Sequence, residues 1–321
     1  MNQILLKKLS RLKGKKIAVI GDIILDRYVF GDVSRISPEA PVPIVKVMNE
    51  EYKLGAAANV AKNLKKMENT PFLIGLTGDD IHANILLSLM KKEDMTTDLI
   101  IRKKKYKTIL KERIISKNQQ MLRIDYDPGT SPLKTGTRII SALKKIKPDA
   151  VIIEDYNKGL LNISAMRNIL KWCRERDIMT VADPHPSRSY QFYKDTYAIT
   201  PNLNEAQHLL HTGKREVPLE KIAEKLNTGC RNTVTLITLG PKGMLLYDKN
   251  FHFIPTRAKE VYDVTGAGDT VVSIFTLALV SGLTPIESAQ LANYAASYVV
   301  TQIGAAACTH EILDGILKND S

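Results

Sequence analysis

Residues 263–270 read DVTGAGDT, and an apolar run typical of a buried helix starts directly after them. Two glycines just before a helix let several backbone N–H groups converge on one point at the positive end of the helix dipole, which favours an anion such as a transferring phosphate. A carboxylate would repel that anion, so Asp269 is better explained as the acceptor of a proton from an attacking hydroxyl. The octet also fits a plain strand-to-helix turn, in which Thr265 caps the helix and the dipole favours Asp269.

Outside this octet, short apolar runs alternate with helical patterns. We expect strands at 15–20, 71–77, 149–154, 178–182, 197–200 and 234–238, and helices at 55–67, 80–92 and 164–176. This order predicts an α/β fold with a doubly wound, mostly parallel sheet flanked by helices. Ligands of such sheets bind beyond the carboxyl ends of the strands. The residues expected at that edge are Gly21, Asp22, Asp155, Asp183, Asn202 and Gly240.

Two stretches, 27–48 and 106–126, carry strand-like runs without intervening helices. Both lie beside expected strand edges, so we predict that they form one small sheet that folds over the site as a lid. No linker, repeat or low-complexity segment interrupts the chain, and residues 1–321 are predicted to form a single domain.

Composition narrows the class of protein. The chain has 321 residues, is 44% hydrophobic and has no apolar run long enough for a membrane span. Its net charge of +12 would suit a nucleic-acid binder, but the lysines are dispersed and aromatic residues are few, so we expect no nucleic-acid or membrane partner. The three cysteines lack metal-binding spacing, which favours reduced thiols in a cytoplasmic protein.

The octet is similar to the carboxy-terminal signature of the ribokinase-like (PfkB) sugar kinases. Further stretches resemble one branch of that family, the kinases that phosphorylate D-glycero-β-D-manno-heptose 7-phosphate at O1 in the heptose pathway for lipopolysaccharide. The stretches are 21–28, SRISPEAPVP at 34–43, LGAAANVA at 54–61, NQQMLRID at 118–125, DYNKG at 155–159, TPNLNE at 200–205, and 261–262.

The resemblance implies roles for the sugar and the reacting phosphate. Asp269 would be the base, and the amides of Gly266, Ala267 and Gly268 would stabilise the phosphate. Asp26, Gly55 and Asn59 would bind the sugar, although from the residues alone they also fit a turn, a hinge and a solvent-facing helix position. Ala56 replaces a glycine of the family, which puts sugar contacts there in question. The cations that match the branch and would hold the sugar phosphate are Lys158, Arg113 and Arg123, which otherwise fit ordinary surface positions.

For the nucleotide, the resemblance implies ATP and Mg²⁺. Asn202 and Glu205 would hold the magnesium, with Glu205 acting through water, and their spacing also predicts a capping box. Thr238, Gly240 and Gly243 would form the nucleotide loop, and Asn293 would line the adenine pocket. Asp263 and Thr265 resemble a monovalent-cation loop in some relatives, which leaves a dependence on K⁺ open.

The resemblance further implies a homodimer formed through the lid. Fused members of the family carry a nucleotidyltransferase domain, and a chain that stops at Ser321 is expected to be the stand-alone kinase. Three alternatives remain. One is a kinase of the same fold for another sugar, sugar phosphate or nucleoside. The second is a non-catalytic sugar-binding regulator, against which an intact Asp269 argues. The third is a nucleic-acid binder, which only the charge favours and which a steep salt dependence of DNA binding would support.

Overall fold

The computed structural model describes residues 2–117, 119–129, 135–213, 217–258, 260–302 and 306–319. Within them, the main sheet has nine strands in the order β13-β12-β11-β10-β9-β8-β1-β4-β5. Neighbours from β5 to β11 are parallel, and β12 and β13 form an antiparallel edge. The strands are β1 (Lys16–Gly21), β4 (Thr70–Thr77), β5 (Ile100–Arg102), β8 (Ala150–Glu154), β9 (Met179–Asp183), β10 (Ala198–Ile199), β11 (Val234–Thr238), β12 (Met244–Tyr247) and β13 (Phe251–Ile254).

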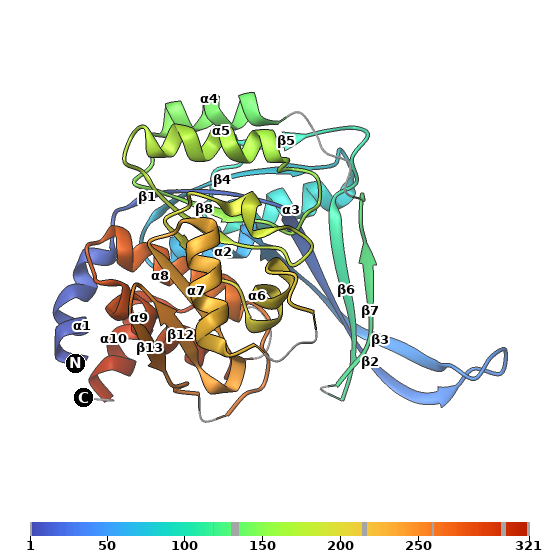
Figure 1. The fold of residues 1–321 in the computed structure, drawn as a ribbon. Helices are drawn as coiled ribbons and strands as arrows, with labels where there is room; N and C mark the ends of the chain where they lie inside the picture. Colours follow the sequence, from blue (N-terminus) through green and yellow to red (C-terminus); the bar gives the residue numbers. More distant parts are fainter. Residues whose placement is uncertain are drawn as a thin grey trace.

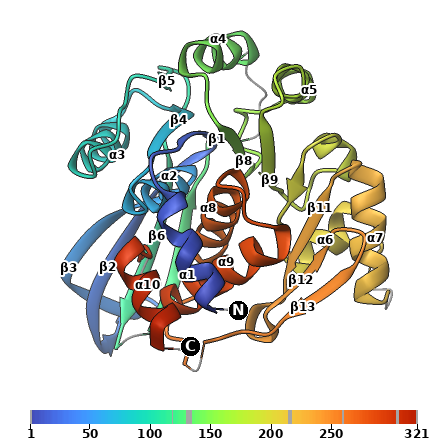
Figure 2. The ribbon, with the colours of Figure 1, turned by 90° about the vertical axis from the view of Figure 1, so that its left-hand side faces the viewer.

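Helices cover both faces of this sheet, as the doubly wound prediction requires (Figures 1 and 2). Alternate residues of β1 serve two cores, because side chains along a strand point to opposite faces. One core includes α1 (Asn2–Leu9), η1 (Ser10–Leu12), α2 (Ala57–Lys66), α3 (Ile81–Lys92), α8 (Ala267–Val280), α9 (Pro285–Val299) and α10 (His310–Asn319). The other includes α4 (Gly136–Ile146), α5 (Ile163–Arg174), η2 (Tyr190–Tyr193), α6 (Leu203–Leu209) and α7 (Leu219–Cys230).

The helix after the octet, α8, is the central helix of the first core. Every residue from Asp269 to Leu279 is buried, and α8 packs against both α2 and α9. A helix that is apolar on all sides can be stable only in such an interior position. No described helix has the length and apolar character that a membrane crossing requires.

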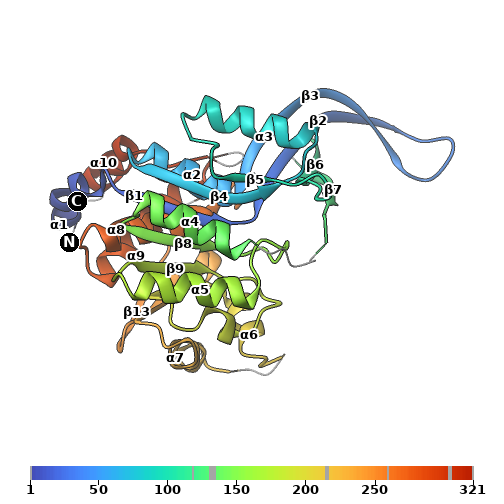
Figure 3. The ribbon, with the colours of Figure 1, turned by 90° about the horizontal axis from the view of Figure 1, so that it is seen from above.

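A second, four-stranded sheet has the order β3-β2-β6-β7. It consists of β2 (Ile23–Ile36), β3 (Pro43–Ala56), β6 (Ile109–Ser116) and β7 (Gln119–Tyr126). The two stretches predicted to share a small sheet do so through parallel pairing of β2 with β6, from Ile24↔Ile109 to Phe30↔Ile115. The sheet is larger than expected, because pairing of β2 with β3 extends from residue 23 to residue 56 and the far part of that hairpin projects as a long arm (Figure 3). Asn118, part of one branch-like stretch, lies outside the described residues.

Candidate active site

Asp269 is the third residue of α8, whose N-cap is Gly266. Gly266 has a φ of 80°, a left-handed conformation that glycine adopts without strain. The Ala267 N–H donates to the carbonyl of Val264 at 3.2 Å, which closes the turn. Three amides were predicted to bind a phosphate. Among the described backbone hydrogen bonds, only the Ala267 N–H of the three has a partner, so the N–H groups of Gly266 and Gly268 can donate to a ligand.

The carboxylate of Asp269 is buried and held in place by one side chain of α2. Asn59 Nδ2 donates to Asp269 Oδ2 at 2.7 Å. Burial raises the pKa of Asp269 to about 6, and the Asn59 hydrogen bond opposes that rise. A carboxylate with this pKa is largely ionised at neutral pH yet still basic enough to take a proton from a substrate. Asn59, expected to touch sugar, is placed on Asp269 instead.

Asp269 borders a polar cavity of about 260 Å³ at the carboxyl edge of the main sheet. Both sheets contribute to its walls, so the small sheet lies against the edge where α/β folds bind ligands. The lining brings together residues far apart in sequence: Asp26, Ala56, Lys111, Arg113, Tyr156, Asp183, Thr200, Asn202, Glu205, Thr238, Thr265, Gly266, Gly268 and Asp269.

Asp26 enters this cavity from β2 and is paired with Arg113 of β6, whose guanidinium donates to Asp26 Oδ1 at 2.5 Å. Gly55 of β3 makes room for this carboxylate, because a Cβ at position 55 would collide with Asp26 Oδ2. The structure thus gives Gly55 a packing role behind Asp26 and does not place it in the cavity lining.

Ala56 lines the cavity next to Gly55 and has a φ of 51° and a ψ of −131°. A residue with a side chain is strained in this region, at a typical cost of ~1–3 kcal/mol. The glycine that the resemblance implies at this position would adopt it freely. The alanine that stands where the resemblance implies a glycine therefore has a strained backbone at the wall of the cavity.

Replacing Ala56 by glycine is expected to raise the free energy of unfolding by ~1 kcal/mol. Relief of the strain exceeds the ~0.4–1 kcal/mol that glycine gives back through greater freedom of the unfolded chain. Urea unfolding measures the change. The matched control is Ala57→Gly at the first position of α2, which should destabilise the protein; equal losses in both variants would show that Ala56 is not strained.

Asn202 and Glu205 form the capping box of α6, with hydrogen bonds of 2.9 and 2.8 Å between each side chain and the other's backbone N–H. Both also line the polar cavity, beside Asp183. Burial raises the pKa of Glu205, and burial together with Glu205 and Asp269 raises that of Asp183 well above its usual range. Asp183, Glu205 and Asp269 repel one another in a desolvated site. A bound cation would reduce this repulsion.

An apolar cavity of about 390 Å³ adjoins the polar one. Both share Thr238, Val264 and Gly268, so the start of α8 lies between them. Three further residues predicted for the nucleotide lie in its lining: Gly240, Gly243 and Asn293. The side chain of Asn293 donates to the carbonyl of Pro255 at 2.7 Å, which fixes the chain at this wall.

This pair of cavities suits two ligands that meet at the amino terminus of α8. The sequence of the chain agrees with that arrangement, since the pattern of the pfkB family of carbohydrate kinases matches residues 14–312. The chain belongs to the pfkB family of carbohydrate kinases. The octet at 263–270 lies within the matched range.

Three curated pfkB-family relatives share the name bifunctional protein HldE. The protein of Actinobacillus succinogenes is 39% identical over 298 residues, which cover 91% of this chain and 61% of the relative. Those of Aliarcobacter butzleri and Helicobacter pylori are 38% and 37% identical, over 96% and 95% of this chain and 65% and 66% of the relatives. The chain thus spans less than two thirds of the length of these relatives.

Solved structures share the ribokinase-like fold of this pfkB-family chain. Ribokinase from Thermotoga maritima has a TM-score of 0.77 at 24% identity and covers 95% of this chain, with all of its own chain matched. Phosphofructokinase-2 from Escherichia coli, in complex with substrates and products, has a TM-score of 0.79 at 17% identity, with 95% and 99% of the two chains covered. At these identities the likeness establishes the fold alone.

Two of the cations predicted to bind the sugar phosphate do not line the polar cavity. Lys158 is ion-paired with Asp127, and Arg123 pairs with Asp125 at 2.9 Å on the outer strand β7. The sequence interpretation missed Lys111 and Tyr156, which line the cavity. Period-two alternation could have found Lys111, since it places residues 111 and 113 on one face of the strand.

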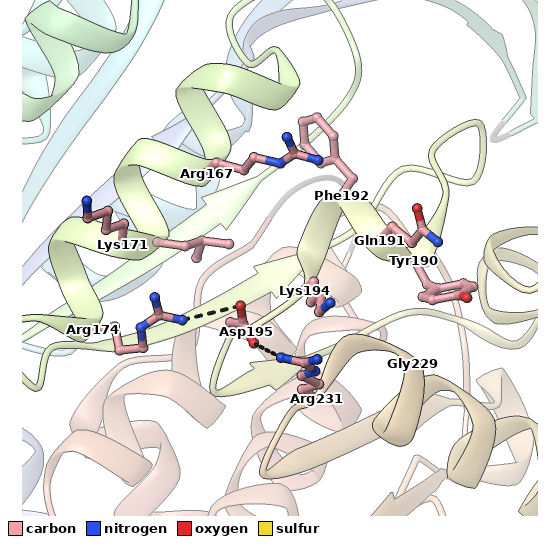
Figure 4. A pocket seen from close by; sticks show the side chains of 11 residues that line it. Arg167, Lys171, Arg174, Tyr190, Gln191, Phe192, Lys194, Asp195, Gly229 and Arg231 are labelled. Carbon is pink, nitrogen blue, oxygen red and sulfur yellow. Dashed lines mark hydrogen bonds and ion pairs between the residues drawn. The ribbon is translucent and has the colours of Figure 1, made fainter.

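A larger, basic groove of about 580 Å³ lies elsewhere on this pfkB-family domain, between α5, η2 and the end of α7 (Figure 4). Arg174 and Arg231 pair there with Asp195, at 3.3 and 4.0 Å. Lys171 and Arg174 lie in the last turn of α5 and Arg231 is the C-cap of α7, positions where the helix dipole favours positive charge. The groove lies near the segments that enter β9, β10 and β11, on the opposite edge of the sheet from Asp269.

Proposed function

We propose that this chain transfers the γ-phosphate of ATP to O1 of D-glycero-β-D-manno-heptose 7-phosphate, giving the 1,7-bisphosphate for ADP-heptose synthesis. The observation that carries the proposal is the position of Asp269, a buried carboxylate at the start of α8 where a polar and an apolar cavity meet. HldE relatives at 37–39% identity support the heptose branch.

In this mechanism Asp269 Oδ1 or Oδ2 takes the proton of the O1 hydroxyl as that oxygen attacks the γ-phosphate. Asn59 fixes the direction of the carboxylate from behind. Asp26 lies opposite, on the four-stranded sheet β3-β2-β6-β7, which we call the lid sheet. It accepts hydrogen bonds from sugar hydroxyls and is itself oriented by Arg113. Holding both partners in line accounts for most of the expected rate enhancement in phosphoryl transfer.

The amides of Gly266 and Gly268 would stabilise the charge on the phosphate, aided by the positive end of α8. The adenine would occupy the apolar cavity beside Asn293, and its phosphates would extend past Thr238 toward Gly268. Since the described residues contain no group of three or more metal-ligating side chains, a metal here depends on the nucleotide for further ligands.

The oxygen ligands of Asn202, Glu205 and Asp183 fit Mg²⁺, which prefers one or two carboxylates together with water and substrate phosphates. When bound, magnesium neutralises charge on the transferring phosphate. Glu205 would act through water, because its carboxylate already accepts the Asn202 N–H. A K⁺ site at the Asp263–Thr265 loop is retained as a prediction; there Asp263 Oδ1 accepts the Thr265 N–H at 2.8 Å.

We further propose that the lid sheet pairs two copies of the chain. Large apolar side chains are exposed on it, including Ile36 at 60%, Met48 at 71% and Leu122 at 55%. Exposed apolar side chains on one sheet favour its use as an interaction surface. The buried free thiols Cys173, Cys230 and Cys308 fit the reducing cytoplasm in which ATP and sugar phosphates are found.

The substrate assignment is tested by following ADP release from purified protein across sugars and sugar phosphates. We expect kcat/KM for the heptose 7-phosphate to exceed that for ribose and fructose phosphates by at least ~10²-fold, because unmatched buried polar groups penalise the wrong substrate. A preference for ribose, fructose 1-phosphate or a nucleoside would leave the kinase mechanism intact and remove the heptose assignment.

A further inference from the structure

Lys111 lies in the middle of β6, on the face of the lid sheet that borders the polar cavity. Its register neighbours are Asp26 on β2 and Asp125 on β7. The ammonium group stands over the ring of Tyr156, 4.8 Å from the ring centroid. Tyr156 belongs to the loop that follows β8, so Lys111 spans from the lid to the main sheet.

The basic residues around this side of the cavity differ in whether they are paired with a carboxylate. Arg113 is paired with Asp26, Arg123 with Asp125 and Lys158 with Asp127. Lys111, by contrast, forms no ion pair with any residue that the structure describes, and its recorded partner is an aromatic ring. The ammonium group of Lys111 can therefore pair with an anionic ligand.

The pKa of Lys111 is consistent with an ammonium group that has no carboxylate partner. Burial lowers its pKa, and Asp26 and Asp125 oppose this shift, while Arg113 and Arg123 add to it. The net lowering means that the carboxylates nearby do not compensate for the lost solvation. A phosphate dianion would restore that compensation through a charge-assisted hydrogen bond.

The position of Lys111 favours the phosphate of the sugar over that of ATP. Lys111 lines the polar cavity and is absent from the lining of the apolar cavity, as is every residue of the lid sheet. Burial lowers the pKa of His185 and Asp155 raises it, while Lys158, Arg188 and Lys111 add to the lowering. Lys158 and Arg188 are paired with Asp127 and Asp155, so Lys111 is the one of these three cations that has no carboxylate partner among the described residues.

We propose that Lys111 binds the phosphate that the sugar substrate already carries and so selects phosphorylated sugars. This inference rests on the proposed function, since it presumes a sugar phosphate as acceptor. It assigns the substrate's phosphate to a residue of the lid, so that a phosphorylated sugar links the lid to the main sheet through Lys111 and the Tyr156 loop.

The test compares kcat/KM for the best sugar phosphate with kcat/KM for the same sugar lacking that phosphate. In Lys111→Met, which keeps the length of the stem but not the charge, we expect this ratio to fall at least ~10-fold, the scale of one hydrogen bond to a charged group. Lys111→Arg should restore most of the ratio. Lys104→Met, at an exposed lysine outside the cavity, is the matched control and should keep the wild-type ratio.

Titration calorimetry of the sugar phosphate without ATP gives a second readout, in which Lys111→Met should weaken binding by a similar factor. A large wild-type ratio that survives in Lys111→Met would overturn this inference alone. So would an equal loss for both sugars, because it would place Lys111 on the transferring phosphate. A wild-type ratio near one would overturn the inference together with the proposed substrate class.

Discussion

Replacing Asp269 by asparagine is expected to lower kcat at least ~10²-fold, because the variant keeps the shape of the side chain and loses the proton acceptor. ATP affinity should hardly change, since Asp269 is absent from the lining of the apolar cavity. Steady-state ADP release and calorimetric titration with ATP measure the two quantities. Retention of more than a tenth of the activity would rule out Asp269 as the base.

Folding of this variant can be checked by the direction of its stability change. The pKa of Asp269 is raised to about 6 in the folded protein, so burying the ionised carboxylate costs stability above that pH. At pH 7 asparagine removes this cost, and the melting temperature of Asp269→Asn should be no lower than that of the wild type. A lower melting temperature would point to a structural role.

The same pKa predicts that kcat/KM of the wild type declines as pH falls through about 6, where Asp269 takes up a proton. Asp22 also has a pKa of about 6 in the fold, raised chiefly by burial. Asn59→Ala separates the two, because removing its hydrogen bond should raise the pKa of Asp269 and move the acidic limb to higher pH. A limb that stays in place would belong to another group.

Gly268→Val is expected to abolish turnover while leaving the protein folded. Gly268 is the second residue of α8 and lies between the two cavities. An added Cβ would meet nothing closer than Asp183 Oδ2 at 4.0 Å, so the protein has room for a Cβ at this position. The valine would instead fill the space of the transferring phosphate, and a loss of ~10²-fold or more in kcat/KM follows from displacing it from the amides.

Circular dichroism and thermal melting establish that this variant folds. The matched control is Gly315→Val in α10, another helical glycine with no atom within 4 Å of an added Cβ. It should leave the activity at the wild-type level. Normal activity in Gly268→Val would mean that the glycine-rich loop is only a turn.

The sequence predicted the main sheet well because its parallel strands are buried on both faces and read as short apolar runs. Polar residues directly after such runs, including Asp183 and Asn202, had to meet at one edge, and both line the cavity. Pairing of the two lid stretches was likewise confirmed by β2 and β6. Helix α1 and the β12–β13 hairpin were not predicted, since neither carries a motif.

Some features of the site could not be predicted from the sequence, because they depend on side-chain direction and backbone conformation. Residue types alone did not indicate that both Gly266 and Ala56 have a positive φ. Asn59 was expected to meet the sugar, but its position on α2 turns its amide toward Asp269, a residue 210 positions away. Whether Arg113, Arg123 and Lys158 are already paired is decided by tertiary contacts, and that pairing singles out Lys111.

The central claim is transfer of phosphate to an anomeric oxygen at Asp269. Phosphorus NMR of the product from D-glycero-β-D-manno-heptose 7-phosphate and ATP tests it most directly. The account predicts one new phosphate signal coupled to the anomeric proton, with the 7-phosphate signal retained and no such product from Asp269→Asn. A new phosphate on any other carbon, or no phosphorylated product from the wild-type enzyme, would contradict it.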